Sequence, residues 1–171
     1  LEHLLERLQG SHDVILVDCP GSDNPFVRAA HGLANAVLTP INDSFVDLDV
    51  LAQNDEDEAH LFAPSTYSEM VWSERKDRFL RDGAPLSWGV VRNRVAPRAS
   101  RNRAKMDKAL ELIAPRLHLK LLPGLGERVI YRELFSFGLT IADLRERGLG
   151  LGISLQHLAA RQEVRTLAHQ V

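Results

Sequence analysis

The chain has 171 residues, of which 44% are hydrophobic and 26% are charged, and this composition excludes collagen-like, low-complexity and wholly disordered proteins. Its net charge of −2 argues against a generic polyanion binder, although a local patch can still be basic. The single cysteine, Cys19, excludes an internal disulfide, and no apolar run approaches the ~20 residues that span a bilayer. We therefore expect a soluble cytoplasmic protein.

Helical and strand patterns alternate along the chain. A first amphipathic helix carries Leu4, Leu5 and Leu8 on one face. Four apolar runs have the length of buried strands, at residues 13–18, 36–39, 88–91 and 118–122. Further helical patterns are found at residues 25–33, around 67–72, from 101 to near 115 and at 153–167. The last pattern has Ile153, Leu155, Leu158 and Leu167 at helical spacing and predicts a terminal helix that closes the fold. Strands separated by helices predict an α/β fold with a mostly parallel sheet.

An acidic run lies between the second and third predicted strands. Residues 43–58 include seven acids and no Lys or Arg: Asp43, Asp47, Asp49, Asp55, Glu56, Asp57 and Glu58. The run lacks the pattern of a calcium loop, so we interpret it as a solvated face or as the rim of a partner site. Phe45, Leu48 and Leu51 recur there at helical spacing, which favours core packing.

The first predicted strand ends in Asp18, and Pro20 and Gly21 follow it. In phosphate-binding α/β proteins an acid at this position holds Mg²⁺, and a glycine N–H can approach the γ-phosphate because no Cβ intrudes. The same residues also form an ordinary turn before a helix, so the motif alone leaves both interpretations open. Cys19 has no neighbouring base and is interpreted as a packing residue.

Asn93 ends the third predicted strand and is followed by Arg94. An Asn amide offers the donor and the acceptor that the N6/N7 edge of adenine demands. Asn is also a good turn former, and taken alone that interpretation is favoured.

The third notable segment is basic. Residues 98–108 hold one acid, Asp107, against five basic residues: Arg98, Arg101, Arg103, Lys105 and Lys108. On a helix capped by Ser100, the basic side chains of 101, 105 and 108 share one face, and Met106, Leu110 and Ile113 share another. The basic face is either simply solvated or a sequence-independent surface for DNA phosphates.

Four motifs together indicate a protein family: Asp18-Cys19-Pro20-Gly21, Thr39 to Asp47, Val91-Arg92-Asn93-Arg94 and Arg128 to Thr140. Together they resemble the MipZ family of division-plane positioning ATPases in the ParA/MinD superfamily. The resemblance covers about residues 13–143, and the last motif is the most specific. It implies a three-layer P-loop NTPase-like fold, with residues 1–171 forming a single nucleotide-binding domain.

The resemblance also implies an activity and partners. It implies an ATP-dependent homodimer that uses Mg²⁺, binds non-specific DNA and a ParB-like centromere-binding protein, and inhibits FtsZ assembly. Such a protein is cytoplasmic, associates with the nucleoid and the cell pole, and has no membrane contact. Two alternatives stay open: a short DNA- or partner-binding module that has lost its ATPase site, and a ParA-type plasmid or chromosome partition ATPase.

The resemblance also implies the residues of the functional sites. Asp18 is the implied catalytic acid, which holds Mg²⁺ through water. The implied nucleotide contacts are Pro20 and Gly21 in the switch, Asn93 and Arg94 at the adenine, and Pro123 and Gly124 closing the base pocket. The implied DNA contacts are Arg98, Arg101, Arg103, Lys105 and Lys108.

One family feature does not occur in the 171 residues: the phosphate-binding Gly-x-x-x-x-Gly-Lys-Ser/Thr loop or its variant with a second lysine. We expect that loop upstream of residue 1. At ~30 residues or more for each βαβ unit, roughly 60 to 100 residues would precede this chain. The domain is then incomplete, and ATP hydrolysis is expected of the full-length protein rather than of this chain alone.

Overall fold

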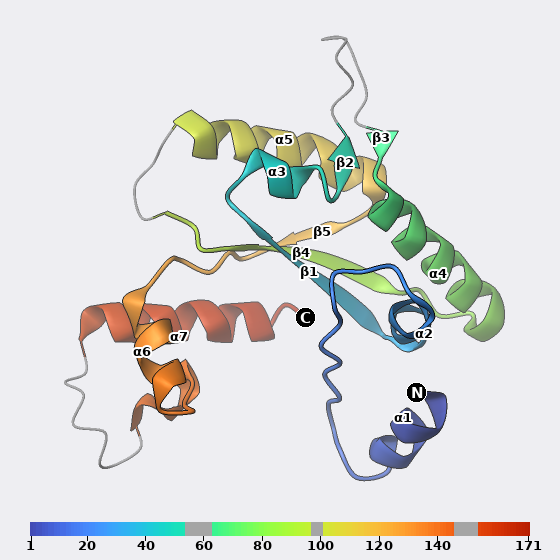
Figure 1. The fold of residues 1–171 in the computed structure, drawn as a ribbon, viewed down its shortest axis with the longest axis horizontal. Coiled ribbons are helices and arrows are strands. Elements are labelled where there is room, and N and C mark those ends of the chain that lie inside the picture. The colour runs from blue at the N-terminus through green and yellow to red at the C-terminus, as the bar shows by residue number, and fades with distance from the viewer. Residues whose placement is uncertain (54–62, 97–100, 146–153) are drawn as a thin grey trace. The chain divides into compact units, whose positions relative to one another are not determined.

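A computed structural model describes residues 1–53, 63–96, 101–145 and 154–171 (Figure 1). The chain divides into two compact units, the first made of residues 1–37 and 48–88, the second of residues 38–47 and 89–171. The helices and strands of the first unit are α1 (Glu2–Gln9), α2 (Pro25–Leu33), β2 (Ala52–Gln53), β3 (Ala63–Pro64) and α4 (Thr66–Asp82). β2 and β3 form a short antiparallel pair.

The helix α2 has the bounds that the sequence predicts, because its capping residues are explicit. The side chain of Asn24 accepts hydrogen bonds from the backbone N–H groups of Phe26 (3.0 Å) and Val27 (3.1 Å). Pro25 takes the first helical position, where no N–H is needed. The helix α4 ends at Asp82 and is capped by Gly83, whose φ of 68° is the left-handed conformation that glycine adopts without strain.

The core of the first unit packs around α2 and α4. Its buried apolar residues are Val27, Ala30, Val37, Leu48, Leu51, Ala52, Met70, Val71, Leu86 and Trp88. The ring of Tyr67 meets those of His31 and Trp88 edge-on, at centroid distances of 6.1 and 6.2 Å. Arg78 is buried as well and donates to the carbonyl oxygens of Leu33 and Ala34, which end α2. The helix predicted around residues 67–72 is therefore confirmed and belongs to the core.

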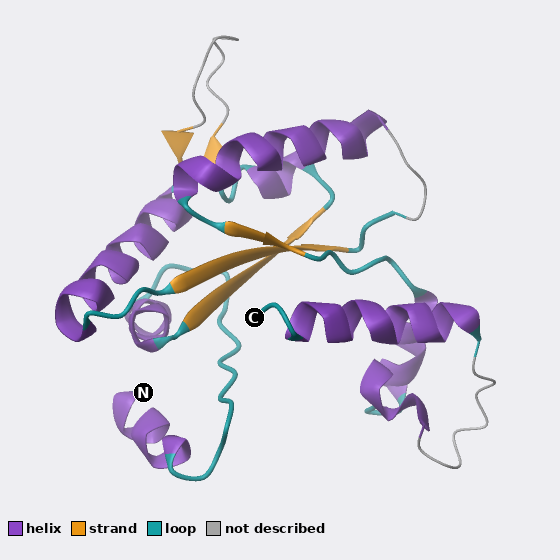
Figure 2. Ribbon diagram, turned by 180° about the vertical axis from the view of Figure 1, so that it is seen from behind, coloured by secondary structure: helices purple, strands orange, loops and turns teal. Residues whose placement is uncertain are grey.

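The second unit contains most of a three-stranded sheet in the order β1-β4-β5. Its elements are β1 (Ala36–Asn42), α3 (Phe45–Leu48), β4 (Ser87–Asn93), α5 (Arg101–Leu117), β5 (Lys120–Leu122), α6 (Val129–Ser136), the 3₁₀ helix η1 (Ile141–Arg145) and α7 (Leu155–Ala168). β4 and β5 are parallel, with Val90 opposite Leu121. α5 lies on one side of the sheet, and α6 and α7 lie on the other (Figures 1 and 2). The predicted α/β fold and three of its four strands are confirmed.

The apolar face of α5 is the predicted one, since Met106, Leu110 and Ile113 are all buried. The helix runs through Pro115 in its last turn and ends at Leu117, two residues beyond the expected break. His118 follows with a φ of 49° and redirects the chain toward β5. Ser100, the expected cap, lies outside the described residues.

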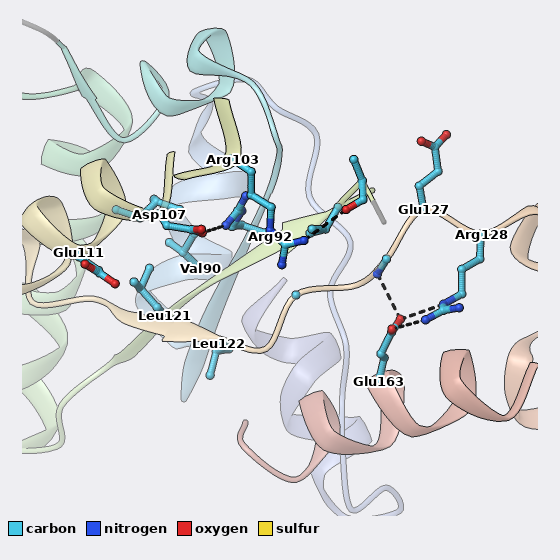
Figure 3. Close-up of a pocket in the computed structure, with 15 residues that line it drawn as sticks. Val90, Arg92, Arg103, Asp107, Glu111, Leu121, Leu122, Glu127, Arg128 and Glu163 are labelled. Carbon is cyan, nitrogen blue, oxygen red and sulfur yellow. Dashed lines mark hydrogen bonds and ion pairs between the residues drawn. The ribbon is translucent and has the colours of Figure 1, made fainter. Parts of the chain in front are cut away.

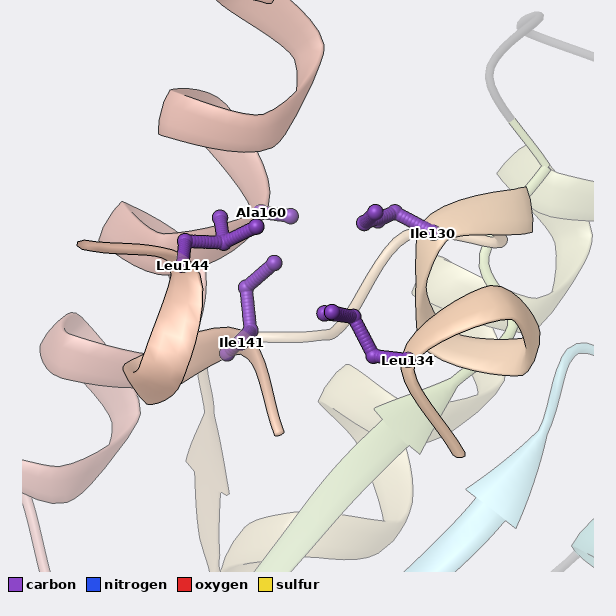
Figure 4. Close-up of a cluster of buried hydrophobic side chains, with 5 residues drawn as sticks. All are labelled: Ile130, Leu134, Ile141, Leu144 and Ala160. Atoms are coloured by element: carbon purple, nitrogen blue, oxygen red, sulfur yellow. The ribbon is translucent and has the colours of Figure 1, made fainter. Parts of the chain in front are cut away.

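The terminal helix α7 is confirmed, but the face it buries differs from the predicted one. Leu155 is 84% exposed and Leu158 is 46% exposed. The small residue Ala160 packs instead against α6 and η1, in a cluster with Ile130, Leu134, Ile141 and Leu144 (Figure 4). Ile153, the remaining residue of the predicted pattern before this helix, lies outside the described residues.

The strand predicted at residues 13–18 is wrong. These residues belong to the loop between α1 and α2 (Figure 2), and Val14 and Leu16 are 80% and 85% exposed. An extended apolar run becomes a strand only when another strand supplies its hydrogen bonds. Within the described ranges, no backbone hydrogen bond joins residues 13–18 to a neighbouring strand.

Candidate functional site

Two segments of the second unit meet where β4 and β5 end: residues 92–95 and residues 123–127. The N–H of Leu125 donates to the carbonyl of Arg92 at 2.8 Å, and the carbonyl of Leu125 accepts from the N–H of Val95 at 3.0 Å. A parallel bridge between Val95 and residue 126 continues this pairing. The loop that follows β5 is therefore fixed against the loop that follows β4. We call this the strand-end junction.

Four of the predicted nucleotide residues lie in the strand-end junction: Asn93, Arg94, Pro123 and Gly124. The Oδ1 atom of Asn93 accepts a hydrogen bond from the N–H of Arg94 at 3.0 Å, and Arg94 has a left-handed φ of 51°. A Cβ at position 124 would lie 3.1 Å from the carbonyl oxygen of Arg92. A larger residue there would push the two segments apart, so glycine permits their close approach.

A cavity of about 430 Å³ lies beside the strand-end junction (Figure 3). Its lining is apolar at Val90, Leu110, Leu121 and Leu122, and polar at Arg92, Arg103, Asp107, Arg128 and Glu163. Gly124 also lines it, whereas Asn93, Arg94 and Pro123 do not. Successive residues of a strand point to opposite faces, which separates Asn93 from the cavity side of β4.

Arg92 joins three elements of the second unit. Its guanidinium pairs with Asp43, which follows β1, and with Asp107 on α5. The side chains of Arg92 and Asp43 are each 14% exposed, whereas that of Asp107 is 48% exposed. The acidic run that includes Asp43 was interpreted as a solvated face or as the rim of a partner site. A solvated position is wrong for Asp43, because its side chain is only 14% exposed and pairs with Arg92. The acids at 55–58 of the same run lie outside the described residues.

Glu163 joins α7 to the loop after β5. Its carboxylate accepts from the N–H of Gly126 (3.1 Å), from Nε of Arg128 (3.2 Å) and from Nη2 of Arg128 (2.5 Å). The hydrogen bond from Arg128 lowers the pKa of Glu163, and the reciprocal bond raises the pKa of Arg128. Burial raises the pKa of the neighbouring Tyr131 hydroxyl. No pattern in the sequence pointed to Glu163, because its partners lie more than thirty residues earlier in the chain.

The remaining predicted phosphate and metal residues belong to the first unit. Asp18, Pro20 and Gly21 are exposed and lie in the loop between α1 and α2. A Cβ added to Gly21 would have no atom within 4 Å, so its backbone is open to a ligand. In the ranges that the structure describes, no group of three or more His, Cys, Asp or Glu side chains is arranged to hold a metal ion.

The predicted DNA residues separate into two groups on α5. Arg101, Lys105 and Lys108 are exposed. Arg103 is half-buried, lines the cavity and donates to the carbonyl of Ala96 at 3.3 Å. Arg98 lies outside the described residues. Of the four expected residues that the structure describes, three therefore form an exposed basic face.

Comparisons with known proteins agree with the motif analysis. Among the described residues, no helix is both long and apolar enough to cross a membrane. No curated protein matches the sequence. The family model described as ATPase MipZ matches residues 1–171, which confirms the resemblance seen in the four motifs. The chain therefore belongs to the MipZ family of ParA/MinD-type ATPases.

Proposed function

We propose that this chain acts in an ATP-dependent dimeric switch that positions the division plane by inhibiting FtsZ assembly, with residues 1–171 contributing one nucleotide-binding domain. One observation carries the proposal: the two segments assigned to adenine are hydrogen-bonded to each other at the carboxyl ends of neighbouring parallel strands. Ligands of open α/β sheets bind at this edge. The family match supports nucleotide binding as the shared activity.

In this proposal the strand-end junction recognises the base. The amide of Asn93 has the donor and the acceptor that pair with the N6/N7 edge of adenine. Pro123 and Gly124 cover the base, and Arg94 lies next to Asn93 in the chain. The hydrogen bonds between Leu125 and the segment 92–95 hold these groups before the nucleotide arrives, which lowers the entropy lost on binding.

The phosphates and the metal are assigned to the loop between α1 and α2. The carboxylate of Asp18 is a hard oxygen ligand of the kind that Mg²⁺ prefers, and it holds the ion through water. When bound, Mg²⁺ neutralises charge on the β- and γ-phosphates. Pro20 restricts the backbone that leads into Gly21, and the N–H of Gly21 donates to a phosphate oxygen. The exposure of this loop and the open space around Gly21 support the assignment, because a ligand can approach the backbone there.

Non-specific DNA is assigned to the exposed basic face of α5, namely Arg101, Lys105 and Lys108, together with Arg98 and Arg103. A helix face that neutralises phosphates binds without sequence preference, and its affinity falls as salt rises. Each lost phosphate contact reduces the slope of log K against log salt by about 0.9. Reversing the charge of Arg101 and Lys105 should therefore flatten the salt dependence of DNA retention. Unchanged retention at low salt would refute this assignment.

The adenine assignment is tested with Asn93→Ala, made in the protein as its own cell produces it. Titration with a fluorescent ATP analogue and its GTP counterpart should show that the variant loses roughly 5- to 150-fold of the preference for ATP, which corresponds to about 1–3 kcal/mol for one bidentate contact. The matched control is Asn35→Ala, in an exposed residue of the first unit. Full preference in Asn93→Ala would exclude the proposed base contact.

The partners are tested separately. Pelleting of FtsZ polymers should decrease when the ATP-bound protein is added, and a ParB-like protein should be retained on a column of it. Binding of ParB without any effect on FtsZ would favour a ParA-type partition ATPase. DNA binding that does not change with ATP, ADP or no nucleotide would favour a module without an ATPase site.

A further inference from the structure

The loop after β5 is held from two sides. The N–H groups of Leu125 and Glu127 donate to the carbonyl oxygens of Arg92, at the end of β4, and of Val95, just after it. The N–H of Gly126, between them, donates to Glu163 on α7 (Figure 3). Three consecutive backbone donors of this loop are thus occupied, and the middle one depends on a single side chain from the terminal helix.

The same carboxylate also fixes the start of α6. Arg128 precedes α6 as its N-cap and gives two nitrogen donors to Glu163. A two-donor contact between a guanidinium and a carboxylate is stronger and more directional than a neutral hydrogen bond. Both side chains are largely shielded from solvent, at 24% and 28% exposure, so screening weakens the contact less than at an open surface.

The position of Glu163 relative to the proposed base pocket gives this contact a function. Pro123 and Gly124 precede Gly126 by only two or three residues, so whatever restrains Gly126 also restrains them. Arg128, two residues after Gly126, also donates to the carboxylate of Glu163, so this one side chain holds the loop at two positions.

We propose that Glu163 is a positioning residue for the base pocket, and that docking of α7 and binding of adenine are therefore coupled. This inference rests on the proposed function. Coupling between two sites is reciprocal, so bound ATP should tighten α7 onto the loop as much as docked α7 improves ATP binding. The terminal helix becomes a point at which a partner can change nucleotide affinity without touching the nucleotide.

The test uses Glu163→Ala, Glu163→Gln and the control Gln162→Ala, whose side chain is exposed on the same helix. Glu163→Ala should weaken ATP binding about 5-fold or more and should weaken GTP binding less, because only adenine has the contact with Asn93 to lose. Glu163→Gln keeps an acceptor for the N–H of Gly126 and loses the charge that Arg128 contacts. Its ATP affinity should therefore lie between those of the wild type and of Glu163→Ala. The control should bind both nucleotides as the wild type does.

Hydrogen exchange without nucleotide gives the second readout. The Gly126 amide should exchange faster in Glu163→Ala, whereas the Leu125 amide, bonded to Arg92, should change less. An unchanged Gly126 amide, or ATP and GTP affinities that fall equally, would overturn the positioning role. If the wild type itself shows no preference for ATP, the adenine assignment fails and the coupling fails with it. If the wild type prefers ATP and Glu163→Ala keeps that preference, only the coupling is refuted.

Discussion

The two carboxylates around Arg92 should contribute unequally to stability. Asp43 is as buried as Arg92, at 14% exposure, whereas Asp107 is 48% exposed. Replacing Asp43 by Asn removes a charged hydrogen bond at a shielded site, which costs about 2 kcal/mol. Replacing Asp107 by Asn removes an ion pair that water already screens, so its cost is below about 1 kcal/mol. We therefore expect a clear order, with Asp43→Asn the more destabilising change.

Arg92 itself should be the most sensitive of the three residues. Its Nε atom is buried and, within the described part of the chain, has no hydrogen-bond partner, so the guanidinium depends on its two carboxylates. Arg92→Met keeps the volume but leaves Asp43 as an uncompensated charge, at a cost of about 3–5 kcal/mol. Arg92→Lys should recover only part of this loss, because an ammonium cannot reach two carboxylates with the planar fork of arginine.

Urea denaturation followed by far-ultraviolet circular dichroism measures these differences. With a slope of about 2 kcal/mol/M, Asp43→Asn should lower the midpoint by about 1 M and Asp107→Asn by less than about 0.5 M. A double-mutant cycle with Arg92→Met isolates the pairwise coupling of each acid. Equal midpoints for the two single variants, or a larger loss for Asp107→Asn, would refute the argument that the more buried carboxylate contributes more to stability.

Three further predictions concern stability. Arg128 holds the pKa of Glu163 below its ordinary value of 4.5. The contact therefore stabilises the fold fully above that pH, and this stability is lost as the pH falls through the lowered pKa. When the pH is lowered from about 6 to about 3, the urea midpoint should fall less in Glu163→Gln than in the wild type. Leu134→Ala should cost about 2–5 kcal/mol in urea denaturation, and the exposed neighbour Phe135→Ala less than about 0.5 kcal/mol; similar costs would contradict the packing of the cluster. Asn24→Ala should lower stability by about 1 kcal/mol through loss of the α2 cap, seen as a lower thermal midpoint, and Asn24→Asp should retain it.

The elements that the sequence predicts correctly are those determined by local pattern. The N-cap of α2, Asn24, and its first residue, Pro25, are adjacent in the sequence and mark the start of the helix. In β4 four consecutive residues, 88–91, are buried, so its sequence alone indicates a strand covered on both faces. The segment expected as a strand at residues 13–18 is at least as apolar as β4, yet it is a loop, because pairing depends on a neighbouring strand that composition does not specify. The buried face of α7 was also misjudged, since Ala160 fits closely against α6 and the larger Leu155 does not contribute.

The same distinction applies to the candidate site. The family resemblance placed Asn93 and Gly124 in one pocket, and the structure brings them together because they follow neighbouring parallel strands that end at one edge of the sheet. Glu163 and Asp43 could not be placed in advance, since each has its arginine partner tens of residues away and nothing in the intervening sequence records the contact. Arg103 resembles its basic neighbours in the sequence, and only the structure shows that it lies on the face of α5 that lines the cavity.

The exposed apolar loop before α2 has a consequence for handling the protein. Val14 to Val17 form an extended, aliphatic and uncharged run, which is the composition that stacks into intermolecular β-structure. Asp13 and Asp18 flank it and act as gatekeepers, because in-register stacking would bring identical carboxylates about 4.8 Å apart in successive chains. High ionic strength screens this repulsion, so concentrated stocks in strong salt should form fibrillar aggregates that low-salt buffers prevent.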